Sequence, residues 1–224
     1  MEVAESFLTL QLKEGEQRTV VDIVDATEPS LRHRVRVECA PRSKLDLILL
    51  QIAGSKTTVM IEQHGTIGSE ATVTWRNFSL GGADVTHDLV SRVIGEGGTS
   101  QVDWVFYAKG SEKQHLSVRN IFDAPHGGGK ITMKGVAEQK GHVQCNGMID
   151  IGLKGAGTDA FLTQNVLMLD KTAKVDAIPG LEIKTNDVKA SHSATISHIT
   201  DEDLFYFGAR GIATKEARRM YIQG

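Results

Sequence analysis

Cysteine and proline are scarce in this 224-residue chain, and it has neither a long apolar run nor an excess of one charge. The two cysteines, Cys39 and Cys145, lie far apart without a CxxC spacing, so neither a disulfide framework nor a zinc knuckle is indicated. The longest apolar run, residues 45–53, is interrupted by two polar residues and is too short to cross a bilayer. The N-terminal stretch lacks the basic region of an export signal. We therefore expect a cytoplasmic protein without a membrane partner.

The formal net charge is only −3, and no run of like charges resembles a nucleic-acid-binding arm. We therefore expect no nucleic-acid partner. The composition, 40% hydrophobic and 24% charged, is that of an ordinary globular protein, and the length suits one sizeable core.

Short runs rich in valine, isoleucine, threonine and aromatic residues fill residues 44–190, with glycine between them. Their side chains often alternate in polarity, which predicts β-strands. Twenty-three glycines suit many tight corners, and the lack of long helical periodicity excludes an alternating βαβ fold. A sandwich, a barrel and a β-solenoid all remain open, because each uses strands of similar length.

The sequence changes character after residue 199. Thr200 and Asp203 have the spacing of a capping box, which predicts the start of a helix that ends near Gly211. Thr214 can cap a second helix, so we expect a small helical hairpin. The first helix has more aromatic side chains than one face needs for docking on a sheet. They either contact another protein or cap the β core.

The segment PGLEIKTNDVKASHSATISHITDEDLFYFGARGIATKEAR, residues 179–218, resembles the C-terminal core of the SufB/SufD family of the SUF iron-sulfur cluster assembly system. It combines Pro-x-Leu-Glu-Ile, Asp-Val-Lys-x-Ser-His, Leu-Phe-Tyr and Arg-Gly-Ile motifs in the family's order. Looser similarity reaches back to about residue 89, whereas the first 80 or so residues match poorly. The pattern is that of a SufD-like, short form.

This resemblance implies an all-β core, a right-handed parallel β-helix closed by C-terminal helices. We accordingly expect a β-helix domain over residues 1–198 and a helical segment over residues 199–224. Stacked coils also explain the glycines, because each coil must turn sharply.

The family also implies a non-enzymatic subunit of a SufBCD-type complex, which dimerises through its β-helix with itself or with a SufB-like partner. Its helical end would dock a SufC-type ABC ATPase. The positions that this implies for ATPase contact are Leu204, Phe205, Tyr206, Arg210, Gly211, Glu216 and Ala217.

In the family, a cysteine and a histidine on the strand that corresponds to residues 187–192 are linked to cluster assembly at the dimer interface. Here the cysteine position is Ala190, which supplies no thiolate, and the histidine is His192, whose imidazole can ligate iron. The candidate metal ligands are His192, Glu182 and Cys145. Any cluster at the interface would be transient, because two distant cysteines cannot enclose a four-thiolate cluster.

Structural interpretations of these three residues remain open. His192 could be an interface histidine that binds nothing, Glu182 a polar strand residue, and Cys145 a buried thiol that packs as a small hydrophobe. Two alternative functions also stay open: a homodimeric scaffold without cluster chemistry, and a β-helix carbohydrate-active enzyme. The enzyme would need paired acids in a groove, and none stands out.

Overall fold

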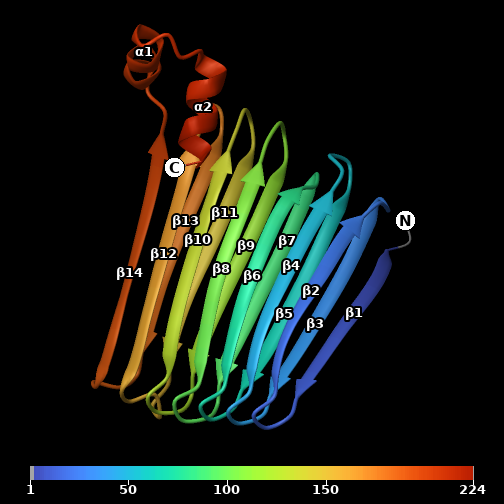
Figure 1. Ribbon diagram of the computed structural model, residues 1–224, viewed down its shortest axis with the longest axis vertical. Helices are drawn as coiled ribbons and strands as arrows, with labels where there is room; N and C mark the ends of the chain where they lie inside the picture. The colour runs from blue at the N-terminus through green and yellow to red at the C-terminus, as the bar shows by residue number, and fades with distance from the viewer. Residues whose placement is uncertain (1–2, 224) are drawn as a thin grey trace.

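The computed structural model describes residues 3–223, which form two seven-stranded parallel sheets followed by two helices (Figure 1). The first sheet has the order β1 (Ala4–Leu12), β3 (Ser30–Cys39), β5 (Thr58–Ile67), β7 (Asp84–Val93), β9 (Lys113–Phe122), β11 (His142–Ile151), β13 (Lys174–Ile183). The second has the order β14 (Val188–His198), β12 (Thr158–Met168), β10 (Gly128–Ala137), β8 (Thr99–Ala108), β6 (Thr72–Gly81), β4 (Lys44–Ala53), β2 (Gln17–Ala26).

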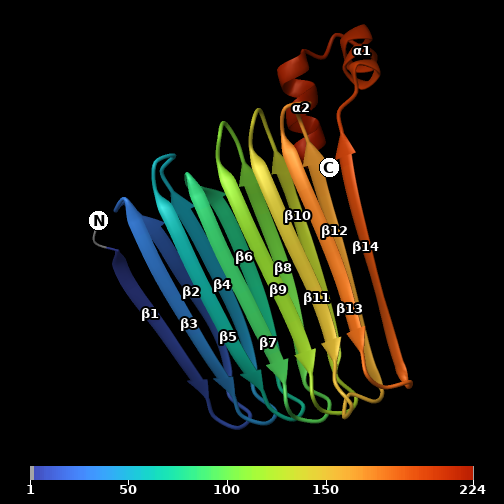
Figure 2. The same cartoon turned by 180° about the vertical axis from the view of Figure 1, so that it is seen from behind.

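The chain alternates between the two sheets and thereby winds into a solenoid of stacked coils. Each strand pairs with the strand one coil away, as Thr58 opposite Asp84 and His142 opposite Lys174 illustrate. Figures 1 and 2 show the two faces of this right-handed coil, with even-numbered strands on one side and odd-numbered strands on the other. The right-handed parallel β-helix expected from the family resemblance is confirmed.

Alternation along the strands, regular in β8 and β11, sends one set of side chains between the sheets and the other to the outer faces. The largest buried side chains include Trp75, Trp104, Phe106 and Phe122. Gly135 makes room for this packing, since a Cβ on it would lie 2.0 Å from ring atoms of Phe106. Large rings in one coil are thus matched by glycine in the next.

The corners after the odd-numbered strands use left-handed backbone conformations. Arg42, Glu70 and His126 have φ angles of 59°, 54° and 56°. In this conformation the amide of Glu70 donates to the carbonyl of Glu96 one coil further on, at 2.8 Å. The glycine-rich segment at residues 123–131 is such a corner, as expected, and leads into β10.

The strands begin earlier than the sequence pattern indicated. Strand-like runs were recognised only from residue 44, although the β-helix domain was expected from residue 1; β1 in fact starts at Ala4. The outward positions of β3 carry Arg32, Arg34 and Arg36, which dilute the apolar signal of the strand while its inward positions remain buried. These charged outward positions obscure the alternating pattern when strands are identified from apolar runs.

The helical hairpin at the C-terminal end consists of α1 (Asp201–Ala209) and α2 (Thr214–Gln223). The predicted capping box is confirmed: the amide of Asp203 donates to the Thr200 hydroxyl at 3.0 Å, and the amide of Thr200 donates to the Asp203 carboxylate at 2.8 Å. Gly211, with a φ angle of 77°, follows the end of α1. Thr214 is the first residue of α2 and not its cap, because the Ala213 carbonyl already accepts the amides of Glu216 and Ala217. No helix within residues 3–223 combines the length and the apolar character that a membrane crossing demands.

Candidate functional site

The last coil of the solenoid, made of β13 and β14, has one unpaired edge on each strand. β14 pairs with β12 only, with Ala160 opposite Ala190 and Leu162 opposite His192. The β12 residues of these pairs are buried, whereas most of β14 is exposed. The final coil therefore presents its inner face, which further coils would otherwise cover.

His192 lies on this uncovered face and is exposed. Its neighbours on the same face are Ala190 and Ala194, both small, so space is left on both sides of the ring. The imidazole makes no hydrogen bond to another residue of the described range 3–223. It is thus placed to reach a group that comes from outside this chain.

Glu182 lies on the opposite sheet, on the outer face of β13 beside Asp150. Its carboxylate lies 2.9 Å from the Lys184 ammonium, and this hydrogen bond holds the pKa of Glu182 below its usual value. The structure therefore does not bring Glu182 next to His192. As a carboxylate ligand, Glu182 would serve a different surface.

Cys145 lies inside the solenoid on β11 and is fully buried. Burial raises the pKa of its thiol to about 11, so the sulfur is a neutral thiol at physiological pH. Residues 3–223 contain no group of three or more His, Cys, Asp or Glu side chains close enough to hold a metal ion. The three candidate ligands do not converge within one chain.

The two helices form what we call the tip, residues 201–223. None of the residues of α1 is buried. Phe205 is 78% exposed and Tyr206 55%, and the Arg210 guanidinium stacks over the Tyr206 ring at 3.6 Å from its centroid. An exposed pair of aromatic rings beside a cation is a composition that protein interfaces favour.

The other predicted contact residues of the tip differ in accessibility. Gly211 and Glu216 are exposed, and Leu204 is partly buried. Ala217 has no exposed surface, because α2 packs it inward. Ala217 therefore cannot touch a partner while the tip keeps this conformation.

Two ion pairs fasten the tip to the turn between β12 and β13. Arg218 on α2 lies 3.0 Å from Asp170, and Lys171 lies 3.1 Å from Asp201 at the start of α1. Asp203 is hydrogen-bonded by Thr200 and by Tyr221 of α2, and both lower the pKa of its carboxyl. The tip is thus tied to the last two coils through polar contacts.

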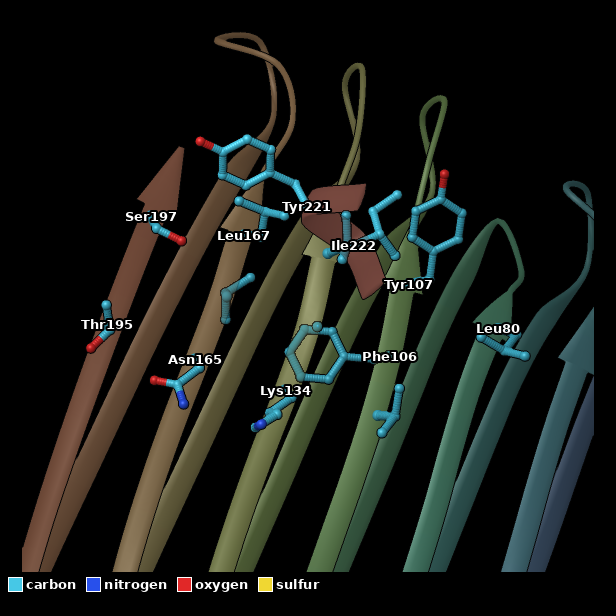
Figure 3. A pocket seen from close by; sticks show the side chains of 14 residues that line it. Leu80, Phe106, Tyr107, Lys134, Asn165, Leu167, Thr195, Ser197, Tyr221 and Ile222 are labelled. Carbon is cyan, nitrogen blue, oxygen red and sulfur yellow. The ribbon is translucent and has the colours of Figure 1, made fainter. Parts of the chain in front are cut away.

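A groove of about 770 Å³ separates α2 from the outer face of the even-numbered strands. Figure 3 shows Tyr221 and Ile222 of α2 at one end of this groove, near Leu167 and Tyr107 of the sheet. Neither these α2 contacts nor the Arg218–Asp170 ion pair could be predicted from the sequence, because a helical period does not tell which turn of a sheet will receive the helix.

The family model described as "SUF system FeS cluster assembly, SufBD core domain" matches residues 3–224. The chain belongs to this family. The match covers the first 80 residues, so the poor similarity expected there was wrong. Strands β1–β3 continue the same solenoid, which is why one family model spans the chain.

The chain is 29% identical to the "Iron-sulfur cluster assembly protein SufD" of Escherichia coli (strain K12) over 219 residues, which is 95% of this chain and 51% of that protein. An iron-sulfur cluster assembly SufBD family protein of Mycobacterium tuberculosis is 29% identical over 192 residues, 81% of this chain and 48% of its own. One from Staphylococcus epidermidis is 27% identical over 160 residues, 71% of this chain and 32% of its own. The chain spans about half the length of the first two of these curated relatives.

Proposed function

We propose that this SufBD-family chain is a non-enzymatic scaffold subunit of an iron-sulfur cluster assembly complex and that its tip docks a SufC-type ATPase. The observation that carries the proposal is the exposure of Phe205 and Tyr206 on a helix that buries none of its own residues. A helix that contributes so little to its own chain's core has its aromatic surface free for a partner. Membership of the SufBD core family supports a partner from the SUF system.

The test is co-purification of the chain with the SufC-type ATPase from the same organism, followed by measurement of the dissociation constant. Replacing both Phe205 and Tyr206 by alanine is expected to weaken binding at least a hundredfold, because central aromatic anchors each contribute about 2 kcal/mol or more. Leu153→Ala is the matched control, since Leu153 is 80% exposed and lies in the corner between β11 and β12, away from the tip. Equal affinity of the double variant and the wild type would contradict tip docking.

The uncovered last coil supports a second part of the proposal, a dimer in which β13 and β14 meet the same elements of a second copy or of a SufB-like subunit. Edge strands with unpaired backbone groups pair readily with another chain. ATP-driven approach of two ATPase subunits would then pull on the two tips and shift this interface, which exposes or reorganises groups such as His192.

A role for His192 in a transient cluster is tested by anaerobic reconstitution with iron and sulfide. Wild type and His192→Ala are compared by absorbance, with His198→Ala as the control because His198 is also exposed on the same strand. Lower absorbance in His192→Ala alone supports the ligand. Identical spectra in all three proteins favour a dimeric scaffold without cluster chemistry.

A further inference from the structure

A basic depression lies on the sheet of odd-numbered strands, at the same end of the coils as the tip. Its volume is about 530 Å³. Lys113, His142 and Lys174 stand in register across β9, β11 and β13, and the preceding turns add Lys140 and Lys171. We call these five residues the basic groove.

Several cations elsewhere on the outer faces of the two sheets lie in ion pairs that join neighbouring coils. Arg34 lies between two carboxylates of neighbouring coils, 3.5 Å from Glu5 and 2.9 Å from Glu62. On the other sheet, Arg76 likewise lies 2.8 Å from Asp46 and 3.3 Å from Asp103. Cross-strand pairs of opposite charge are the arrangement that stabilises a sheet.

Three lysines of the basic groove lack such an ion pair within the described part of the chain, although Asp84 stands opposite Lys113 in the strand register. Across residues 3–223, no carboxylate comes within ion-pair distance of Lys113, Lys140 or Lys174. The nearby Asp176 lies 3.2 Å from His142, so it faces the imidazole. The three lysines are all exposed and contribute little to the fold, while their charges add up in one depression.

We infer that the basic groove receives an acidic segment of the same ATPase that docks on the tip. The inference rests on the proposed function. Lys171 joins the two surfaces, because it lines the groove and also contacts Asp201 at the start of α1. Lysines are flexible point charges, which suit a mobile segment of aspartates and glutamates rather than one fixed carboxylate.

Such a groove acts mainly on the rate and the salt dependence of association. Exposed charges at the rim of an interface steer the encounter and are screened over about 8 Å at physiological ionic strength. The aromatic contacts on α1 depend much less on salt. The two surfaces can therefore be separated experimentally.

The experiment measures the dissociation constant and the association rate for the ATPase at salt concentrations from about 50 to about 500 mM, a range over which the screening length shortens severalfold. The test variant is Lys113→Glu, Lys140→Glu and Lys174→Glu combined, with a glutamine version in parallel. The control combines Lys13→Glu, Lys44→Glu and Lys154→Glu, which makes the same change in net charge at exposed positions in or next to the corners that follow odd-numbered strands, on the opposite edge of the coils. Thermal unfolding checks that each variant folds.

The glutamate variant is expected to bind about tenfold or more weakly at low salt, to lose most of its salt dependence, and to approach wild type at high salt. The glutamine variant should fall between them, and the control should match wild type. Unchanged affinity and salt slope in the groove variants, with normal binding by wild type, overturns the inference and leaves tip docking intact. The same holds if the groove binds inorganic phosphate but not the ATPase. Failure of the wild type to bind overturns both proposals.

Discussion

The guanidinium of Arg218 on α2 lies 3.0 Å from the carboxylate of Asp170, in the turn that joins β12 to β13. The pKa of Asp170 is held below its usual value, first by the backbone amide of Gln139 and then by Arg218. One carboxylate thus links the tip to two neighbouring turns of the solenoid. Asp170 is thus one of the contacts, beside the Lys171–Asp201 pair and the chain connection from β14, that couple the tip to the last coils.

Arg218→Ala should loosen the tip without unfolding the solenoid. The side chains of both partners are less than one third exposed, so the loss is about 1 kcal/mol and is local to α2. We expect faster amide hydrogen exchange in α2 and an unchanged melting temperature of the β core. Arg219→Ala is the control, because Arg219 is exposed on the same helix. Equal exchange rates in both variants would show that this ion pair does not hold α2.

His87 should make the stability depend on pH. Its imidazole is fully buried, lies with its centroid 4.3 Å from that of the Trp104 ring and donates from Nε2 a 2.9 Å hydrogen bond to the side-chain oxygen of Gln63. Burial lowers its pKa from 6.5 to about 3. Below pH 6.5 the unfolded chain therefore binds a proton that the folded chain excludes, and stability falls as the pH falls towards 3, by at most about 1.4 kcal/mol per unit.

Urea unfolding at about pH 4.5 and at about pH 7 measures this effect. His87→Gln should lower stability at neutral pH and reduce the difference between the two pH values by roughly 2 kcal/mol. His115→Gln, at a partly exposed position on the outer face, should keep the wild-type difference. If His87→Gln retains the full difference, other groups are responsible for it.

Gly135→Ala should destabilise the solenoid, because the new methyl group would lie 2.0 Å from the Phe106 ring. Overpacking of this kind costs about 1–3 kcal/mol. Gly208→Ala is the opposite case: nothing lies within 4 Å of its Cβ position on α1, so helix propensity should stabilise that helix by up to about 1 kcal/mol. Chemical denaturation measures the loss of stability in Gly135→Ala. Amide hydrogen exchange in α1 measures the gain in Gly208→Ala. Adding Phe106→Leu to Gly135→Ala should restore part of the loss, and no restoration would place the strain elsewhere.

Ala190→Cys should give the last coil the thiol that the family pattern assigns to this position. Ala190 and His192 lie on one face of β14, so the new sulfur would stand beside the imidazole on the uncovered face. Anaerobic reconstitution should then yield more iron-sulfur absorbance than in wild type. Ser191→Cys is the control, because its thiol points to the opposite face. Equal absorbance in the two variants would show that cluster formation does not depend on the face of β14 that bears His192.

Local signals in the sequence predicted the tip well and the solenoid interior poorly. The Thr200–Asp203 box and Gly211 act through contacts within a few residues, so spacing alone reveals them. Gln63 and His87 are polar, which favours an exposed position, although each shares the inward phase of its strand with apolar residues; both are fully buried and hydrogen-bonded across coils. Their burial depends on a hydrogen bond between residues 24 positions apart in the sequence, and a local pattern does not reveal such a pair.

The candidate site divides in the same way. Phe205 is exposed, as expected from a helix that carries more aromatic side chains than docking on a sheet needs. Ala217 is buried because of the way α2 packs, which the sequence did not indicate. The basic groove was also hidden, because its lysines come from three separate coils and only the parallel register brings them together.

The most direct measurement is amide hydrogen exchange of the chain alone and in complex with its SufC-type ATPase. We predict that the ATPase protects α1 and the turns that carry Lys140 and Lys171, and leaves the corners at the opposite edge of the coils unchanged. Protection at those distant corners, with exchange in α1 the same in the free and bound chain, would contradict docking on the tip.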